Sequence, residues 1–174
     1  MIDPTSTSSS VVKIRPYEPR DLDVVLALNN ANVPALSELA AHEVPRLVGI
    51  SDAALVAEVD GVFAGFCWVL GPGRDYGSLN YAWFSERYSE FVYLDRIAVA
   101  PAFRRLGIGS RFYDELVQQF RADRPVLLCE VNIRPRNDVS LEFHERIGFR
   151  EVGQQDTDGG KKTVSMLALP LRAD

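Results

Sequence analysis

The segment from Val99 to Ser110, VAPAFRRLGIGS, constrains the fold of this 174-residue chain more than any other. A strand-like apolar run ends at Val99, arginines stand at 104 and 105, and glycines at 107 and 109 open a helical pattern. The first turn of a helix leaves about four backbone N–H groups unpaired, and the helix dipole adds positive charge there. Glycines let a bulky anion approach those N–H groups. The segment therefore predicts a strand, a phosphate-binding turn and a helix.

Strand and helix patterns alternate around this unit. Strands are expected at 11–15, 54–59, 62–70, 91–99, 126–132, 149–155 and 162–169, and the Asp60-Gly61 pair predicts a hairpin turn. Helices are expected from Pro19, from Pro34 with a kink or end at Pro45, from Gly107 to about Arg121, and from Asn137 to Gly148. The order β-α-α-β-β-β-α-β-α-β-β predicts one mixed α/β domain over residues 11–174, after a disordered Ser/Thr-rich tail at 1–10.

Composition excludes several classes of protein. The chain is 47% hydrophobic and 25% charged, which is typical of a globular domain. Two cysteines and two histidines make a disulfide framework or a structural zinc site unexpected, so we predict no metal. No apolar run reaches the roughly 18 residues that span a membrane, and the net charge of −5 does not favour nucleic acid. We therefore expect a cytoplasmic protein without a membrane or nucleic-acid partner.

Three known phosphate loops compete for the turn. A P-loop needs a lysine directly after its second glycine, and none follows here. A dinucleotide fingerprint needs a third glycine, but Phe112 stands in its place. The third pattern is Arg/Gln-x-x-Gly-x-Gly, which Arg104, Gly107 and Gly109 match. A glycine-rich helix start with solvated arginines is the alternative that these six residues alone leave open.

This third pattern resembles the coenzyme A pyrophosphate loop of the GNAT superfamily of acyl-CoA-dependent N-acyltransferases. Family members precede the loop with Ala-Val-x-Pro, as residues 98–101 do here. They follow it with an asparagine, a small residue, an aromatic residue and a Gly-Phe pair, which Asn137, Ser140, Phe143 and Gly148-Phe149 match. The order of elements also matches, so the resemblance covers about residues 11–170.

The resemblance implies a GNAT-like fold whose central mixed sheet is splayed between its fourth and fifth strands. It implies acetyl-CoA as the acyl-donor cosubstrate, with the pantetheine arm lying in the gap. The backbone of Ile97, Ala98 and Val99 would bind the pantetheine, and one N–H would polarise the thioester. Asn137 would bond the pantetheine, or serve only as a helix cap, and Phe143 would pack on the cofactor. The pyrophosphate would lie on Arg104, Arg105, Leu106, Gly107, Ile108, Gly109 and Ser110.

Family chemistry implies direct attack of a primary amine on the thioester in a ternary complex. A carboxylate takes the amine proton. The candidates are Glu130, on the strand after the cofactor helix, and Asp95, but either could instead form a buried ion pair with Arg96. His144 stands where the family has a proton-donating tyrosine, and an imidazole can also donate a proton. It could equally be a packed helix residue, or hold the substrate.

The acceptor is the least determined part of the site. Tyr76, Tyr81, Trp83 and Phe84 lie in the connection 71–90 and could form an acceptor pocket, a local core or the surface of a homodimer. Acceptors from small amines to protein N-termini stay open. The missing tyrosine leaves a second hypothesis, a catalytically degenerate protein that binds or senses acyl-CoA. A third, an interaction module built on the aromatic connection, would bind no acetyl-CoA.

Overall fold

The computed structural model describes residues 10–172, so nearly all of the expected tail at 1–10 lies outside the described residues. None of the helices in that range is both long and apolar enough to cross a membrane. The elements are β1 (Val12–Pro16), α1 (Leu22–Asn30), α2 (Glu43–Ile50), β2 (Ala53–Val59), β3 (Val62–Leu70), α3 (Leu79–Ser85), β4 (Val92–Val99), α4 (Ile108–Phe120), β5 (Val126–Arg134), α5 (Asp138–Ile147), β6 (Arg150–Thr157) and β7 (Lys162–Pro170). The predicted order is confirmed, with α3 as one short additional helix in the connection 71–90.

The strands form one sheet in the order β1-β2-β3-β4-β5-β7-β6. Every neighbouring pair is antiparallel except β4 and β5. These two parallel strands pair only at Val92 with Leu127 and at Tyr93 with Leu128, and then they diverge. The predicted splay between the fourth and fifth strands is therefore confirmed, and it leaves one side of β4 without a strand partner beyond Tyr93.

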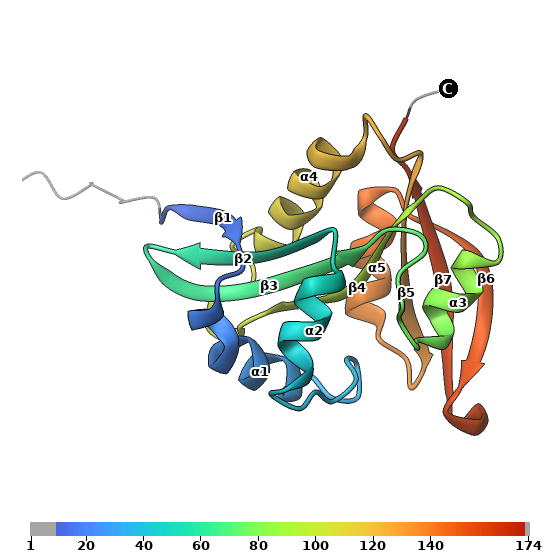
Figure 1. The fold of residues 1–174 in the computed structure, drawn as a ribbon, viewed down its shortest axis with the longest axis horizontal. Helices are drawn as coiled ribbons and strands as arrows, with labels where there is room; N and C mark the ends of the chain where they lie inside the picture. Colours follow the sequence, from blue (N-terminus) through green and yellow to red (C-terminus); the bar gives the residue numbers. More distant parts are fainter. Residues whose placement is uncertain (1–9, 173–174) are drawn as a thin grey trace, which may run out of the picture.

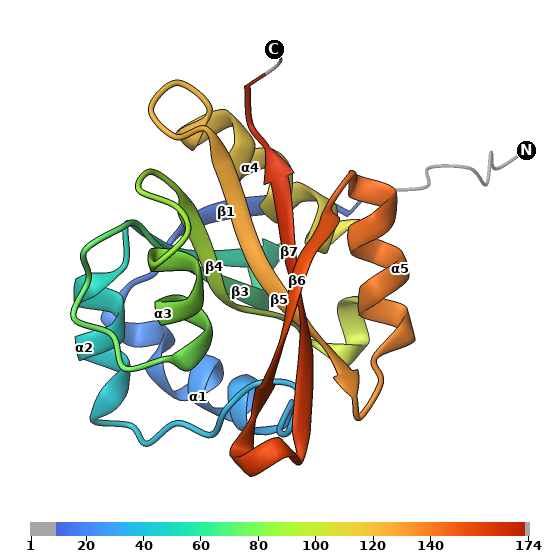
Figure 2. The ribbon, with the colours of Figure 1, turned by 90° about the vertical axis from the view of Figure 1, so that its right-hand side faces the viewer.

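Helices cover both faces of the sheet (Figures 1 and 2). On one face lies α4, whose Ile108, Phe112 and Leu116 are almost fully buried against β1–β4. On the other face, α1 and α2 bury Val25 and Val44. Apolar residues at a spacing of four along α4 make the continuous stripe that a helix needs to pack on a sheet.

Local signals account for several element boundaries. Asp60 and Gly61 both have positive φ, 50° and 82°, as the predicted hairpin turn between β2 and β3 requires. Asn137 caps α5 by accepting a hydrogen bond from the Ser140 amide at 3.1 Å. Gly148 ends α5 at φ 109°.

One helix begins later than its pattern suggests. Residues 34–42 form no α-helix, and α2 begins at Glu43, so the prediction of a helix from Pro34 was wrong. Pro45 lies in the first turn of α2, where the N–H that proline lacks would have no intrahelical partner. The non-helical connection between α1 and α2 lies beside the splayed strands and lines the same cavity as they do.

Candidate functional site

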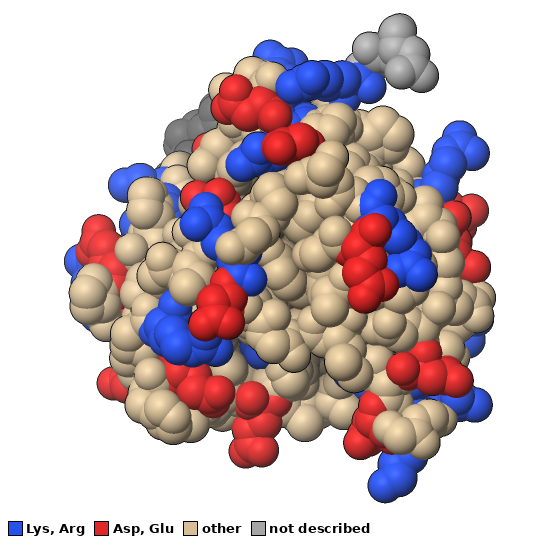
Figure 3. Space-filling model, turned by 45° about the vertical axis from the view of Figure 1, so that its right-hand side comes forward, with Lys and Arg blue, Asp and Glu red and all other residues tan. Residues whose placement is uncertain are grey.

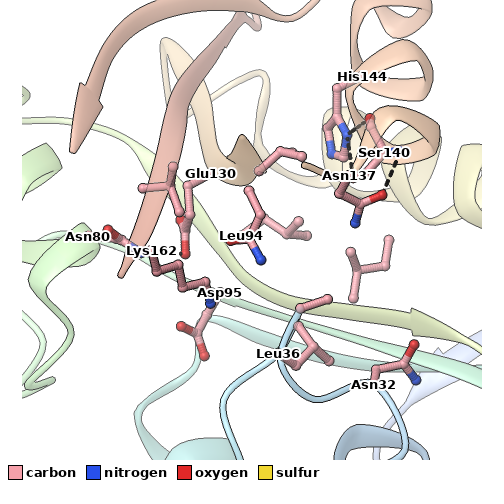
Figure 4. Close-up of a pocket in the computed structure, with 15 residues that line it drawn as sticks. Asn32, Leu36, Asn80, Leu94, Asp95, Glu130, Asn137, Ser140, His144 and Lys162 are labelled. Atoms are coloured by element: carbon pink, nitrogen blue, oxygen red, sulfur yellow. Dashed lines mark hydrogen bonds between the residues drawn. The ribbon is translucent and has the colours of Figure 1, made fainter. Parts of the chain in front are cut away.

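A cavity of about 180 Å³, here called the central cavity, lies where β4 and β5 diverge (Figure 4). Strands β4 and β5, helix α5 and the connection between α1 and α2 supply most of its lining. An adjoining outer cavity of about 420 Å³ continues toward Tyr76 and α2 and shares six lining residues with it: Ala35, Leu36, Asn80, Asp95, Glu130 and Lys162. The remaining lining residues of the central cavity are Asn32, Leu94, Ile97, Val131, Asn132, Asn137, Ser140, His144 and Val164.

A β-bulge places Asp95 at this site. In the pairing of β3 with β4, Trp68 faces Arg96 and Val69 faces Leu94, so Asp95 is an additional residue on β4. A bulge re-aims side chains that strict alternation would send to opposite faces. Leu94 and Asp95 both line the central cavity although they are adjacent in sequence.

The oxygens of Asp95 already have partners. The Tyr76 hydroxyl donates to Oδ1 at 2.7 Å, and the Arg96 guanidinium lies 3.1 Å from Oδ2. Arg96 is 4% exposed and also donates to Asn29 and to Ser37, which lies in the connection between α1 and α2. Burial raises the pKa of Asp95, and Arg96 opposes that rise. The buried ion pair that the sequence left open is therefore present for Asp95.

The carboxylate of Glu130 is only half satisfied. Its Oε1 accepts hydrogen bonds from the Tyr93 hydroxyl at 3.0 Å and from Asn80 Nδ2 at 2.9 Å. Gln155 donates to Asn80 Oδ1 at 2.9 Å and thereby orients that amide. Glu130 Oε2 is shielded from solvent and has no partner among the described residues. Burial, with a further contribution from Asp95, raises the pKa of Glu130 to about 7, so this carboxylate can accept and release a proton near neutral pH.

Asn80 and Gln155 are site residues that sequence reasoning missed. They lie on α3 and β6, far apart in the chain, and meet only because both elements flank β7 and β5. Tyr93 carried a weak signal, since it is a polar-tipped residue on the same strand as Asp95 and Arg96. No local pattern marks Asn80 or Gln155.

His144 is held at both ring nitrogens. Its Nδ1 lies 2.6 Å from the Ser140 carbonyl oxygen, and its Nε2 lies 2.6 Å from the Tyr113 hydroxyl. Because a carbonyl oxygen only accepts, Nδ1 carries the proton and Nε2 accepts from Tyr113. Burial lowers the pKa of His144, which favours the neutral ring. In this tautomer Nε2 has no proton to give, so the expected role as proton donor would need a different hydrogen-bond arrangement.

The loop before α4 presents exposed backbone and positive charge. Arg104 and Arg105 are exposed, and Arg105 and Gly107 adopt φ of 68° and 75°. The Arg111 amide bonds the Gly107 carbonyl and closes the first helical turn, so the amides before it lack an intrahelical partner. This donor set fits a pyrophosphate, because backbone N–H groups and two guanidiniums surround one helix N-terminus.

Gly109 has a second structural reason to be glycine. A Cβ on Gly109 would lie 3.0 Å from the tip of the Phe143 ring, so this ring packs directly on the helix backbone. The contact joins α5 to the first turn of α4. Phe143 and Gly109 thus lie together, whereas contact of Phe143 with the cofactor, which the resemblance implied, stays a prediction. Ile108, by contrast, turns its side chain into the core and is 1% exposed, which leaves only its backbone for a ligand.

The aromatic residues of the connection 71–90 separate into two groups. Tyr76 lines the outer cavity. Tyr81 and Phe84, spaced three apart on α3, are buried in a core with Phe91 and β4, and neither lines the two cavities. Trp83 packs on β6, where a Cβ at Gly153 would approach its ring to 2.6 Å. Of the four aromatic candidates for acceptor binding, only Tyr76 therefore reaches the site, because the amphipathic face of α3 turns toward the sheet.

Comparison with known proteins agrees with this architecture. The model of the acetyltransferase (GNAT) family matches residues 27–149, well over half of the chain. Over 107 residues the chain is 30% identical to a phosphinothricin N-acetyltransferase of Streptomyces viridochromogenes, and the match covers 62% of this chain and 52% of that protein. The chain thus spans about half the length of this curated relative.

Solved structures share the fold at low sequence identity. The ribosomal-protein-S18-alanine N-acetyltransferase of Escherichia coli matches with a TM-score of 0.71 at 18% identity, covering 94% of this chain and 96% of that one. Ard1 of Thermoplasma volcanium matches with a TM-score of 0.73 at 18% identity, covering 93% and 99%. The Salmonella typhimurium protein yncA, solved with its cofactor acetyl-CoA, matches with a TM-score of 0.72 at 18% identity, covering 95% and 96%.

Proposed function

Because this chain belongs to the GNAT family of acetyltransferases, we propose that it transfers an acetyl group from acetyl-CoA to the primary amine of a small molecule or peptide. The amine attacks the thioester directly in a ternary complex. The observation that carries this proposal is the unpartnered, buried Oε2 of Glu130, a residue that lines the central cavity between the splayed strands. An acyl-CoA sensor without catalysis would need no such atom.

Glu130 is the proposed base. A free alkylammonium has a pKa of about 10.4 and must lose a proton before it can attack. Glu130, with a pKa of about 7, is largely ionised just above neutral pH and can accept that proton at Oε2 while Tyr93 and Asn80 hold Oε1. Asp95 is the weaker candidate because Tyr76 and Arg96 occupy its oxygens.

The residues around the cavity also fit the proposed cosubstrate. The backbone of residues 97–99, which pairs with β3 on one side only, would hydrogen-bond the pantetheine, and one N–H would polarise the carbonyl. Residues 104–110 would bind the pyrophosphate through backbone N–H groups. Asn137 would bond the pantetheine through its amide nitrogen, and Phe143 would contact the cofactor. When bound, acetyl-CoA supplies the activated acetyl group.

The direct test is release of coenzyme A thiol from acetyl-CoA in the presence of a broad panel of amines. We expect release that depends on one class of amine and on Glu130. Acetyl-CoA affinity without thiol release for any amine would favour the degenerate binding protein instead. Absence of any acetyl-CoA affinity would contradict both.

Arg104→Ala is expected to weaken acetyl-CoA binding by about 10- to 100-fold, as for the loss of one charge-assisted contact to a phosphate. Isothermal titration calorimetry measures this. Arg121→Ala, at the opposite end of α4, removes the same charge from an exposed position and should leave the affinity unchanged. Equal affinities for both variants and the native protein would place the pyrophosphate elsewhere.

His144→Phe is expected to keep turnover within about tenfold of the native value while lowering thermal stability. The reason is that Tyr113, which is 2% exposed, loses the nitrogen to which its hydroxyl donates, at a cost of about 1–3 kcal/mol. Steady-state kinetics with one confirmed acceptor and a melting curve measure the two effects. A proton donor would instead lose about 10²–10⁴-fold in turnover. Such a loss in a folded variant would restore the donor role of His144.

A further inference from the structure

The ammonium group of Lys162 is an unpaired cation at the acceptor side of the site. Lys162 begins β7 and lines both the central and the outer cavity. Its Nζ donates one hydrogen bond, to the Pro34 carbonyl oxygen at 3.0 Å. No carboxylate among residues 10–172 forms an ion pair with it. An ammonium has three N–H donors, so two are left for a ligand.

Two further cations, Arg46 and Arg96, line the outer cavity but not the central one, and Arg46 donates to the Asp75 carbonyl oxygen. The position of Arg96 differs from that of Lys162. The Arg96 guanidinium forms an ion pair with Asp95 and donates hydrogen bonds to Asn29 and Ser37, and the side chain is buried. Its charge is therefore matched within the protein. Among the described residues, Lys162 is the cation that lines the central cavity, and no carboxylate matches its charge in direct contact.

Glu130 supplies the opposite charge in the same space. Lys162 and Glu130 both line the central cavity and lie on the same side of it in Figure 4. The charge of Lys162 lowers the pKa of Glu130, which places the two groups within electrostatic range although they form no ion pair. The cavity thus offers an unpartnered carboxylate oxygen and an unpaired ammonium to one bound molecule.

We propose that the acceptor is a small zwitterion, a primary amine that carries an anionic group a few bonds away, as a free amino acid does. Lys162 binds the anionic group, and Glu130 Oε2 faces the amine. In the transfer a nitrogen–carbon bond forms and the carbon–sulfur bond of the thioester breaks. The ammonium gives one proton to Glu130 before its nitrogen attacks. The nitrogen loses its second proton as the carbon–sulfur bond breaks, and the thiolate takes that proton through solvent water. This inference rests on the proposed acetyltransferase activity.

The bond from Lys162 to Pro34 favours a small acceptor over a peptide. It joins the first residue of β7 to the connection between α1 and α2, two segments that lie side by side in Figure 2 and both line the cavities. An extended chain leaving the cavity between them would have to break this bond. A peptide N-terminus also has an amide where a free amino acid has its carboxylate, and so gives Lys162 no anion.

Charge on the outer surface does not provide this selectivity by itself. On the face shown in Figure 3, acidic and basic side chains are interspersed rather than gathered by sign. On this face, a charged acceptor is therefore distinguished by the groups within the central cavity, where Lys162 is the cation that would select an anion.

The test is acetylation of the twenty standard amino acids, each compared with its methyl ester and with a dipeptide that begins with the same residue. Thiol release is measured at a pH well above the Glu130 pKa of about 7, so that this carboxylate is ionised in every variant. We expect at least one free amino acid to exceed its ester and its dipeptide in kcat/KM by about 10- to 100-fold. The ester amine loses its proton more easily, so poorer use of the ester reports the missing anion.

Lys162→Met keeps the length of the side chain and removes its charge. It is expected to lower kcat/KM for that amino acid by about 10- to 100-fold, mainly through KM, and to change the value for the ester less than about threefold. Lys162→Arg should recover part of the loss. Lys161→Met, an exposed neighbour that lines neither cavity, is the matched control and should behave as the native protein.

Two outcomes overturn the inference while the acetyltransferase proposal stands. One is an ester or dipeptide used as well as the free amino acid. The other is an equal loss for all acceptors in Lys162→Met, which would leave Lys162 as a residue that only fastens the two segments together. If no amine of any kind causes thiol release, the acetyltransferase proposal itself is overturned, and this inference with it.

Discussion

Replacing Glu130 with glutamine is expected to lower turnover by about 10²- to 10⁴-fold, the usual range for a general base, with acetyl-CoA affinity unchanged. The amide oxygen of glutamine can still accept the hydrogen bonds from Tyr93 and Asn80, so the geometry of the cavity is kept. What is lost is the ability to take a proton at the position of Oε2. Steady-state kinetics and calorimetry measure turnover and affinity separately.

The pH dependence provides an independent measure of the same role. The base acts in its ionised form, so native turnover should fall as the pH drops through the Glu130 pKa of about 7. This acidic limb should be absent from the residual activity of Glu130→Gln. Asp95→Asn is the comparison variant, and it should keep the limb. If Asp95→Asn removes the limb and Glu130→Gln does not, the base is Asp95.

Melting curves can show whether Glu130→Gln loses turnover because it unfolds or because it lacks the base. The pKa of Glu130 lies at about 7 in the folded protein, against a usual value of 4.5, so folding is favoured by the protonated form. The native protein therefore loses stability as the pH rises between these two values. Glu130→Gln has no charge to bury and should not melt below the native protein above pH 7. A variant that is inactive only because it melts would contradict the assignment.

Gly65→Ala is expected to destabilise the fold by about 2–4 kcal/mol, which lowers the melting temperature by roughly 5–15 °C for a chain of this length. Gly65 lies on β3 opposite Val99, and a Cβ there would approach the Ala98 carbonyl oxygen to 2.5 Å. A backbone oxygen cannot yield without moving β4. Because β4 carries the backbone that is proposed to bind pantetheine, acetyl-CoA affinity should fall as well.

Gly49→Ala is the matched control for this substitution. Gly49 lies within α2, and nothing lies within 4 Å of the position its Cβ would take. Alanine is a better helix former than glycine by roughly 1 kcal/mol, so this variant should melt at or above the native temperature. Two equal melting temperatures would mean that β3 and β4 tolerate a wider spacing than the contact at Ala98 indicates.

Local chemistry made much of the fold predictable. The Asp60-Gly61 pair specifies a turn because both positions need positive φ, and the structure has it. The Gly107-x-Gly109 pattern and the apolar stripe of α4 fix where that helix begins and which face it buries. Each of these signals operates within a few residues, so neighbouring positions in the sequence suffice to read it.

Part of the site was out of reach of such reasoning. The bulge at Asp95 arises from the register between β3 and β4, and it decides that Asp95 faces the cavity. The bonds from Asn80 and Gln155 around Glu130 join residues on α3, β5 and β6. The hydroxyl that occupies His144 Nε2 belongs to Tyr113, which lies on a different helix, α4. These contacts join residues that are distant in the chain, so no periodic pattern in the sequence predicts them.

The sequence by itself determined the order of the elements, the loop at 104–110 that is proposed to bind the pyrophosphate, and the presence of two carboxylates near the splayed strands. Only the tertiary structure decided between those carboxylates, because their hydrogen-bond partners come from distant segments. Asp95 is occupied by Tyr76 and Arg96, whereas Glu130 keeps one buried oxygen free. Proton affinity depends on burial and on the charges within a few ångströms, and these are properties of the folded chain.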